Sequence, residues 1–151
     1  MMRIRPATLH DLDFIVDGNL ALAVETEQLQ LDRDALRAGV RAVLEARVPG
    51  RYWIAEVEGT PVGQLLITFE WSDWRNGMIW WIQSVYVTLA ARHGGVFRAL
   101  YEHVRREAQS ASACGLRLYV DTRNVAAQRV YAAIGMNGEH YRVFEDMFDT
   151  Q

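Results

Sequence analysis

The fold is decided by residues 78–100, which read MIWWIQSVYVTLAARHGGVFRAL. The first ten of them, Met78–Val87, are apolar at both alternating sets of positions, which is typical of a strand covered on both faces. We expect one face to carry Ile79, Trp81, Val85 and Val87, and the other to carry Trp80, Ile82 and Tyr86. Met78–Val87 is therefore predicted to be a central strand of a sheet.

A short loop from Thr88 to His93 connects this strand to a helix predicted from Gly94 to Ser112. Glycines at a helix start let the backbone approach a ligand closely. The first N–H groups of a helix have no internal partner and lie at the positive end of its dipole. Arg92, His93 and Arg98 add side-chain donors. The pattern predicts a phosphate cradle, although glycines here equally often serve only to turn the chain.

The rest of the chain alternates between strand and helix patterns. Strands are predicted at residues 2–5, Tyr52–Val57, Val62–Phe69 and Leu116–Asp121, with one or two more between Tyr141 and Phe148. Helices are predicted after Thr8, which forms a capping-box pattern with Asp11, over residues 32–47 and from Asn124 to Ile134. The order β-αα-βββ-α-β-α-β(β) predicts an α/β or α+β fold with a mixed sheet.

Composition limits the class of protein. A chain of 151 residues, half of them hydrophobic, predicts a single globular domain over residues 1–151. The net charge of −3 gives no electrostatic case for a nucleic-acid partner, and the apolar runs are too short to span a bilayer. A lone cysteine, Cys114, supplies neither a disulfide framework nor a paired zinc site. We therefore expect a cytoplasmic protein without a metal, a membrane partner or a nucleic-acid partner.

Two motifs resemble the GCN5-related N-acetyltransferases, the GNAT superfamily. Residues 92–97, Arg-His-Gly-Gly-Val-Phe, are similar to its Arg/Gln-x-x-Gly-x-Gly/Ala signature, with Phe97 where the family has a small residue. Residues 124–136 resemble its Asn-x-x-Ala…Tyr-x-x-x-Gly-Phe segment, with Asn124 and Tyr131 at the key positions. The resemblance covers nearly the whole chain and implies a mostly antiparallel central sheet flanked by helices.

The resemblance implies that the chain binds acetyl-coenzyme A as a co-substrate. Backbone groups of residues 85–87 would pair with the pantetheine arm, and residues 92–98 would hold the pyrophosphate. The implied cofactor residues are Val85, Tyr86, Val87, Arg92, His93, Gly94, Gly95, Val96, Phe97, Arg98, Asn124 and Tyr131. Asn124 is also a good N-cap for the helix that follows it.

Acetyl transfer to an amine needs a proton acceptor, an oxyanion donor and a proton donor for the thiolate. By resemblance, a backbone N–H near Val85 is the oxyanion donor and Tyr131 is the acid. Some members of the family carry a glutamate base on the fourth strand, where this chain has Trp81. Glu70, at the end of the preceding strand, is then the candidate base, directly or through water, and its alternative role is that of a solvated carboxylate.

The acceptor is expected to be a small primary amine or an amino-acid-like molecule, bound by Glu25, Trp71 and Gln83. Carboxylates and indole faces suit a cation, although tryptophans equally form cores or dimer contacts. Three alternatives remain: a non-catalytic acyl-coenzyme A sensor, an enzyme for another acyl chain, and an enzyme for a protein amine. The aromatic tail from Tyr141 to Phe148 is suited to a homodimer contact.

Overall fold

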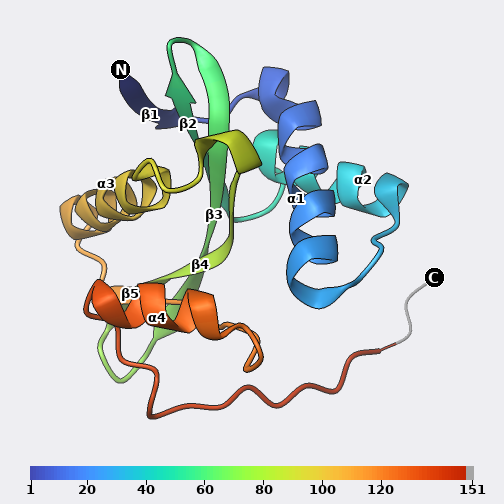
Figure 1. The fold of residues 1–151 in the computed structure, drawn as a ribbon. Helices are drawn as coiled ribbons and strands as arrows, with labels where there is room; N and C mark the ends of the chain where they lie inside the picture. The colour runs from blue at the N-terminus through green and yellow to red at the C-terminus, as the bar shows by residue number, and fades with distance from the viewer. Residues whose placement is uncertain (149–151) are drawn as a thin grey trace. The chain divides into compact units, whose positions relative to one another are not determined.

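The computed structural model describes residues 1–148, which fall into two compact units, Met1–Leu118 and a second that begins at Tyr119 (Figure 1). The strands of the first unit are β1 (Met2–Pro6), β2 (Arg51–Val57), β3 (Thr60–Ser72), β4 (Gly77–Val87) and β5 (Gly115–Arg117). Its helices are η1 (Leu9–Asp11), α1 (Leu12–Glu27), α2 (Arg33–Leu44), η2 (Leu89–Ala91) and α3 (Val96–Ser110). The second unit contains α4 (Val125–Ala133). The single domain over residues 1–151 stays a prediction.

The five strands form one sheet in the order β1-β2-β3-β4-β5. Neighbouring strands are antiparallel except for β4 and β5, which are parallel. The predicted class, a mixed and mostly antiparallel sheet with flanking helices, is confirmed. β4 has a partner strand on each side, and Ile79, Trp80 and Ile82 are buried on it. The apolar run of residues 78–87 therefore identified a central strand correctly.

A bulge in β4 corrects the predicted side-chain faces. Ile82 lies opposite Ile67 and Ser84 lies opposite Leu66, so Gln83 is one extra residue. An extra residue reverses the alternation of side chains beyond it. In the structure, one face of β4 carries Trp80, Ile82, Val85 and Val87, and the other carries Ile79, Trp81, Ser84 and Tyr86. The predicted division of faces is therefore wrong beyond Gln83, because a strict period of two contains no bulge.

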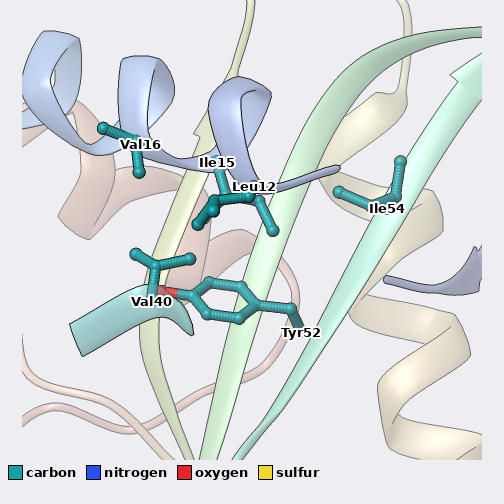
Figure 2. Close-up of a cluster of buried hydrophobic side chains, with 6 residues drawn as sticks. All are labelled: Leu12, Ile15, Val16, Val40, Tyr52 and Ile54. Atoms are coloured by element: carbon teal, nitrogen blue, oxygen red, sulfur yellow. The ribbon is translucent and has the colours of Figure 1, made fainter. Parts of the chain in front are cut away.

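The two faces of the sheet pack against different helices (Figure 1). The face of Val87 packs against α3, and the approach is so close that a Cβ on Gly63 would lie 2.8 Å from Val96 Cγ1. The other face packs against α1 and α2. Its buried core consists of Leu12, Ile15, Val16, Val40, Tyr52 and Ile54 (Figure 2).

A buried polar contact also fixes α1 on the sheet. The fully buried Gln64 donates from Nε2 to the carbonyl of Ile15 at 3.1 Å. Gly18 makes room for this side chain, because a Cβ there would clash with the Gln64 amide. The predicted capping box of Thr8 and Asp11 is present at η1, immediately before α1. The position of α1 is therefore determined at its N-terminus and along its middle.

The C-terminal part corrects two expectations. β5 covers only Gly115–Arg117, whereas the sequence predicted a strand to Asp121. Residues 136–148 contain no strand, so the prediction of one or two tail strands is wrong; residues 149–151 lie outside the described residues. The physical reason is that aromatic strand propensity acts only when a neighbouring strand packs against the side chains, and the tail side chains Tyr141, Phe144 and Met147 are exposed. Among the described helices, none is long and apolar enough to cross a membrane.

Candidate active site

The loop between β4 and α3, which we call the cradle loop (Thr88–Gly95), has the backbone geometry of an anion cradle. His93 and Gly95 both have positive φ angles, of 66° and 80°. Such alternating left-handed residues turn successive N–H groups toward one side. The first intrahelical bond of α3 runs from the N–H of Ala99 to the carbonyl of Gly95, at 3.0 Å. The N–H groups of Val96, Phe97 and Arg98 precede it and have no intrahelical acceptor.

The side chains of this segment have contacts with the sheet and along the helix. Val96 is buried against the sheet and anchors the start of α3. Phe97 packs along the helix against Tyr101, with ring centroids 6.1 Å apart. Arg98 donates to Glu102 at 3.0 Å, also along the helix. The substitution of Phe for a small residue at position 97 therefore leaves its N–H at the helix start.

The end of β4 supplies a second set of backbone groups. The parallel pairing with β5 reaches only Trp81, opposite Arg117. The N–H of Thr88 donates to Val62 at 2.9 Å across β3. Because backbone groups alternate along a strand, those of Val85 and Val87 then lie on the opposite edge, beyond the end of the β5 pairing. This edge and the cradle loop follow each other directly in the chain.

Arg92 contacts protein groups rather than extending into the cradle. Its Nε donates to the carbonyl of Val87 at 3.0 Å, and its Nη2 lies 2.7 Å from Glu25 Oε1. The guanidinium carbon lies 5.4 Å from the ring centroid of Tyr86. The Tyr86 hydroxyl donates to the other oxygen of Glu25 at 3.0 Å. These three residues, the Glu25 cluster, connect α1, β4 and the cradle loop.

Burial, followed by the hydrogen bond to the Glu25 carboxylate, raises the pKa of the Tyr86 phenol. Tyr86 therefore remains a hydroxyl donor at neutral pH. Glu25, predicted to bind the acceptor, has both carboxylate oxygens engaged by protein donors. Sequence spacing gave no sign of this contact, because 67 positions separate Glu25 from Arg92.

Glu70, the candidate base, has a similar set of partners. Its Oε1 accepts from Trp81 Nε1 at 3.1 Å and from Arg117 Nη1 at 2.8 Å. These three residues form the Glu70 cluster, on β3, β4 and β5. The hydrogen bond from Trp81, then the contact with Arg117, lowers the pKa of Glu70. The carboxylate is therefore ionised at neutral pH and is a weaker base than an isolated glutamate.

The structure separates the predicted acceptor residues. Tyr86 of the Glu25 cluster is opposite Gln64, six residues from Glu70 along β3. Six residues of extended strand span about 20 Å. Gln83, in the bulge, donates to Thr68 at 2.8 Å, and Trp71 is an exposed side chain near the end of β3. Trp71 and Gln83 belong to the half of the sheet that holds Glu70, not to the end of α1 that holds Glu25.

The second unit carries two predicted residues on or next to α4. Asn124 is the N-cap of α4, and its Oδ1 accepts from the N–H of Ala127 at 3.1 Å, so the predicted cap is confirmed. Tyr131 lies in the same helix, and burial raises the pKa of its phenol. A raised pKa keeps the hydroxyl protonated at neutral pH, as a proton donor requires.

The sequence did not predict Arg117 as a site residue. It contacts Glu70 because β5 pairs in parallel with β4, which puts Arg117 directly opposite Trp81. The only available signal was one arginine within a short apolar strand. Within residues 1–148, no group of three or more metal-ligating side chains is close enough together to hold a metal ion.

Several solved structures are similar to this chain. A structure described as "a possible acetyltransferase from Clostridium difficile 630" is 38% identical, with a TM-score of 0.91, and each chain covers 99% of the other. A ribosomal-protein-alanine N-acetyltransferase from Brucella melitensis biovar Abortus 2308 is 16% identical, with a TM-score of 0.78 over 97% of this chain and all of that one. The aminoglycoside N-acetyltransferase AAC(6')-Iy, solved in complex with CoA, is 20% identical, with a TM-score of 0.80 over 97% and 95% of the two chains. The last two show the fold alone.

The curated proteins contain no match to this chain. The model of the acetyltransferase (GNAT) family matches residues 20–136, more than half of the sequence. That span includes β4, the cradle loop, α3 and α4. The chain therefore belongs to the GNAT acetyltransferase family and is an acetyltransferase.

Proposed function

We propose that this enzyme transfers the acetyl group of acetyl-coenzyme A to the primary amine of a small molecule by direct attack. One observation carries the proposal: the outer edge of β4 at Val85 and Val87 leads directly into a loop that aims backbone N–H groups at the start of α3. Coenzyme A presents its groups in the matching order. Its extended pantetheine arm carries amides that suit the strand edge, and the pyrophosphate that follows suits the N–H groups of the helix start. The CoA complex of AAC(6')-Iy, a protein of the same fold, supports this donor.

The backbone provides most of the donor site in this proposal. The pantetheine amides pair with the outward carbonyl of Val85 and the outward N–H of Val87, in the manner of an added strand, since the Val87 carbonyl accepts from Arg92. The pyrophosphate accepts from the N–H groups of Val96, Phe97 and Arg98, where the helix dipole favours negative charge. His93 and Arg98 lie beside it on the surface. Asn124 is the proposed side-chain contact to the pantetheine arm.

Acetyl transfer creates negative charge on the carbonyl oxygen and then on the departing sulfur, and each needs a donor. The N–H of Val85 stabilises the oxyanion of the tetrahedral intermediate. Tyr131 donates a proton to the departing thiolate, because its raised pKa keeps the phenol protonated. The amine nitrogen forms the new C–N bond to give this intermediate, and the C–S bond breaks when the intermediate collapses, so no covalent enzyme intermediate is needed.

We propose Glu70 as the group that takes the proton from the amine through a chain of water molecules, because five strand residues, about 16 Å, separate it from Leu65, the residue opposite Val85. Its lowered pKa means that it does not keep the proton, which passes on to solvent. Gln83, in the same half of the sheet, is the proposed acceptor contact. Trp71 has an exposed indole that suits a cation, but it directly follows Glu70 on β3 and lies on the opposite face of the sheet, which makes it a less suitable partner for the same amine. Glu25 is a less suitable acceptor ligand, because Arg92 and Tyr86 already occupy its carboxylate.

The test is a thiol-release assay with acetyl-coenzyme A and two panels of acceptors: small amines and amino acids, and peptides with free N-termini or lysines. We expect turnover with at least one small amine, and a loss of about 10²-fold in kcat for Tyr131→Phe, with coenzyme A binding retained. Turnover on peptides alone would replace the small amine by a protein amine. Coenzyme A binding without turnover on either panel would show a sensor, and preference for longer acyl chains would revise the acyl group.

We also propose a cytoplasmic homodimer. The support is the tail, where the large apolar side chains of Tyr141, Phe144, Met147 and Phe148 are each at least 78% exposed. Sedimentation of the full chain, compared with a variant carrying serine at Phe144 and Phe148, measures the dimer directly. A monomer at high concentration for the unchanged protein contradicts this part of the proposal.

A further inference from the structure

Glu25 occupies a position that a helix alone disfavours. It lies in the last turn of α1, which ends at Glu27 and has no basic residue in that turn. The C-terminal end of a helix carries a partial negative charge, so an acidic side chain there is destabilising. In this chain the carboxylate is instead stabilised by Arg92 and Tyr86, which come from β4 and the cradle loop.

Arg92 is the first anchor of the cradle loop. Its bond to the Val87 carbonyl spans five residues and closes the turn that leaves β4. The two positive-φ residues, His93 and Gly95, follow immediately. A non-glycine residue at positive φ costs free energy and persists only where its surroundings hold it. The buried Val96 holds the far end of the loop, and Arg92 holds the near end.

The support behind Glu25 is rigid. The buried Gln64 fixes the middle of α1 to the sheet through the Ile15 carbonyl. Tyr86, directly opposite Gln64 on β4, fixes the end of α1 through Glu25. The carboxylate thus reaches Arg92 from a helix that is held at two points. The side chains of Glu25 and Arg92 each keep about a third of their surface exposed, so solvent screens their ion pair only in part.

We propose that Glu25 is a positioning residue for the donor site: by holding Arg92, it keeps the cradle loop in the conformation that binds the pyrophosphate of acetyl-coenzyme A. In this proposal the Arg92 side chain supports the loop, and the backbone N–H groups at the start of α3 bind the phosphates. The inference rests on the proposed donor. It replaces the expectation that Glu25 binds the acceptor and that the Arg92 side chain binds phosphate.

The alternative role of Glu25, competition with phosphate for Arg92, predicts the opposite change in the Kd of coenzyme A. If Glu25 merely competes with phosphate for Arg92, its removal releases the guanidinium and tightens coenzyme A binding. If Glu25 positions Arg92, its removal loosens the loop and weakens binding. The direction of the change in Kd therefore shows whether the Arg92 side chain supports the loop or binds phosphate.

The experiment measures the Kd of coenzyme A by calorimetry for the full-length protein and for Glu25→Gln, which keeps the shape and the acceptor for Tyr86 but removes the charge. We expect Kd to rise about three- to tenfold, the range for a partly buried ion pair. Asp17→Asn is the matched control, because Asp17 lies on α1 like Glu25 and its ion pair with Arg33 of α2 is exposed. It should leave Kd within about twofold.

A double-mutant cycle isolates the mechanism. In an Arg92→Gln background, Glu25→Gln should have no further effect on Kd, because the group it acts through is gone. Kinetics with an amine that turns over should show a raised KM for acetyl-coenzyme A with kcat and the acceptor KM unchanged. Melting curves identify a variant that is unfolded rather than repositioned, and the retained affinity for coenzyme A in Asp17→Asn checks the assay.

Four results overturn the inference: an unchanged or lower Kd in Glu25→Gln, additive effects in the cycle, an equal loss in Asp17→Asn, or a raised acceptor KM in place of the donor KM. Failure of the unchanged protein to bind coenzyme A would instead overturn the proposed function and this inference with it. The two failures are therefore distinguishable in the first titration.

Discussion

The Glu25 cluster and the Glu70 cluster are built from the same kinds of groups and do different things. Each has a carboxylate, an arginine and an aromatic donor: Arg92 and Tyr86 in one, Arg117 and Trp81 in the other. The Glu25 cluster joins a helix, a strand end and a loop. The Glu70 cluster lies within three adjacent strands of one sheet.

This difference determines what each cluster can control. Paired strands are held by their backbone hydrogen bonds, so the Glu70 cluster adjusts the charge and orientation of its carboxylate without deciding where the strands lie. In the cradle loop, backbone hydrogen bonds join Ala91 to Thr88 and Arg92 to Leu89. We expect the side chains of the Glu25 cluster to hold the rest of the loop, residues 93–95. We therefore expect losses in the Glu25 cluster to affect donor binding and losses in the Glu70 cluster to affect chemistry and acid stability.

The largest expected effect is the loss of donor binding in a variant of Arg92, compared with the matching variant of Arg117. Arg92→Ala removes a charged partner of Glu25 and a donor to Val87, and should raise the Kd of coenzyme A by about tenfold or more. Arg117→Ala should leave that Kd within about twofold, since its partner is in the sheet. Calorimetry measures both. Equal losses in the two variants would remove the distinction between the clusters.

Smaller effects are expected from the aromatic donors. Tyr86→Phe removes only a hydroxyl that donates to Glu25, and should raise the Kd of coenzyme A about two- to fivefold, as for one lost hydrogen bond to a charged group on the surface. Trp81→Phe removes the donor to Glu70 and should instead raise the pKa of that carboxyl. Titration of the Glu70 carboxyl by NMR follows the second change. A donor-binding defect in Trp81→Phe would contradict the assignment.

The smallest effect concerns acid stability. The pKa of Glu70 in the folded protein lies below its ordinary value of 4.5, so the ionised carboxylate stabilises the fold above that pH. This contribution is lost as the pH falls through the folded pKa. Glu70→Gln should therefore show a smaller drop in Tm between pH 7 and pH 3.5 than the unchanged protein, with Glu102→Gln, an exposed pair on α3, as the control. An equal drop in Tm for Glu70→Gln and for the unchanged protein would mean that the Trp81 and Arg117 contacts do not stabilise the charge of Glu70.

In the same Glu70→Gln variant, the rate should fall without a shift in the acid limb of kcat/KM. Glu70 is ionised across neutral pH, so that limb reports the ammonium group of the acceptor. A limb that moves with the substitution would show that Glu70 itself titrates in the working range, against its lowered pKa.

Several features could be predicted from local chemistry. The apolar run of residues 78–87 identified the central strand, the glycines after it marked the turn into α3, and Thr8 and Asn124 marked helix starts. Each depends on groups within a few residues of one another. The bulge at Gln83 could not be predicted this way, because it depends on how β3 and β4 pair. The tail strands were predicted from propensity and are absent from residues 136–148, because propensity alone supplies no partner strand.

The sequence by itself determined the family and the order of the elements from β1 to α4, and it predicted the backbone donor site, since these follow from hydrophobic period, glycine placement and two motifs. Only the tertiary structure decided which carboxylate meets which arginine. Glu25 meets Arg92 because α1 packs across β4, and Glu70 meets Arg117 because β5 pairs in parallel with β4. Such contacts join residues about 50 to 70 positions apart, and no local pattern fixes them, because their geometry comes from the packing of whole elements rather than from neighbouring residues.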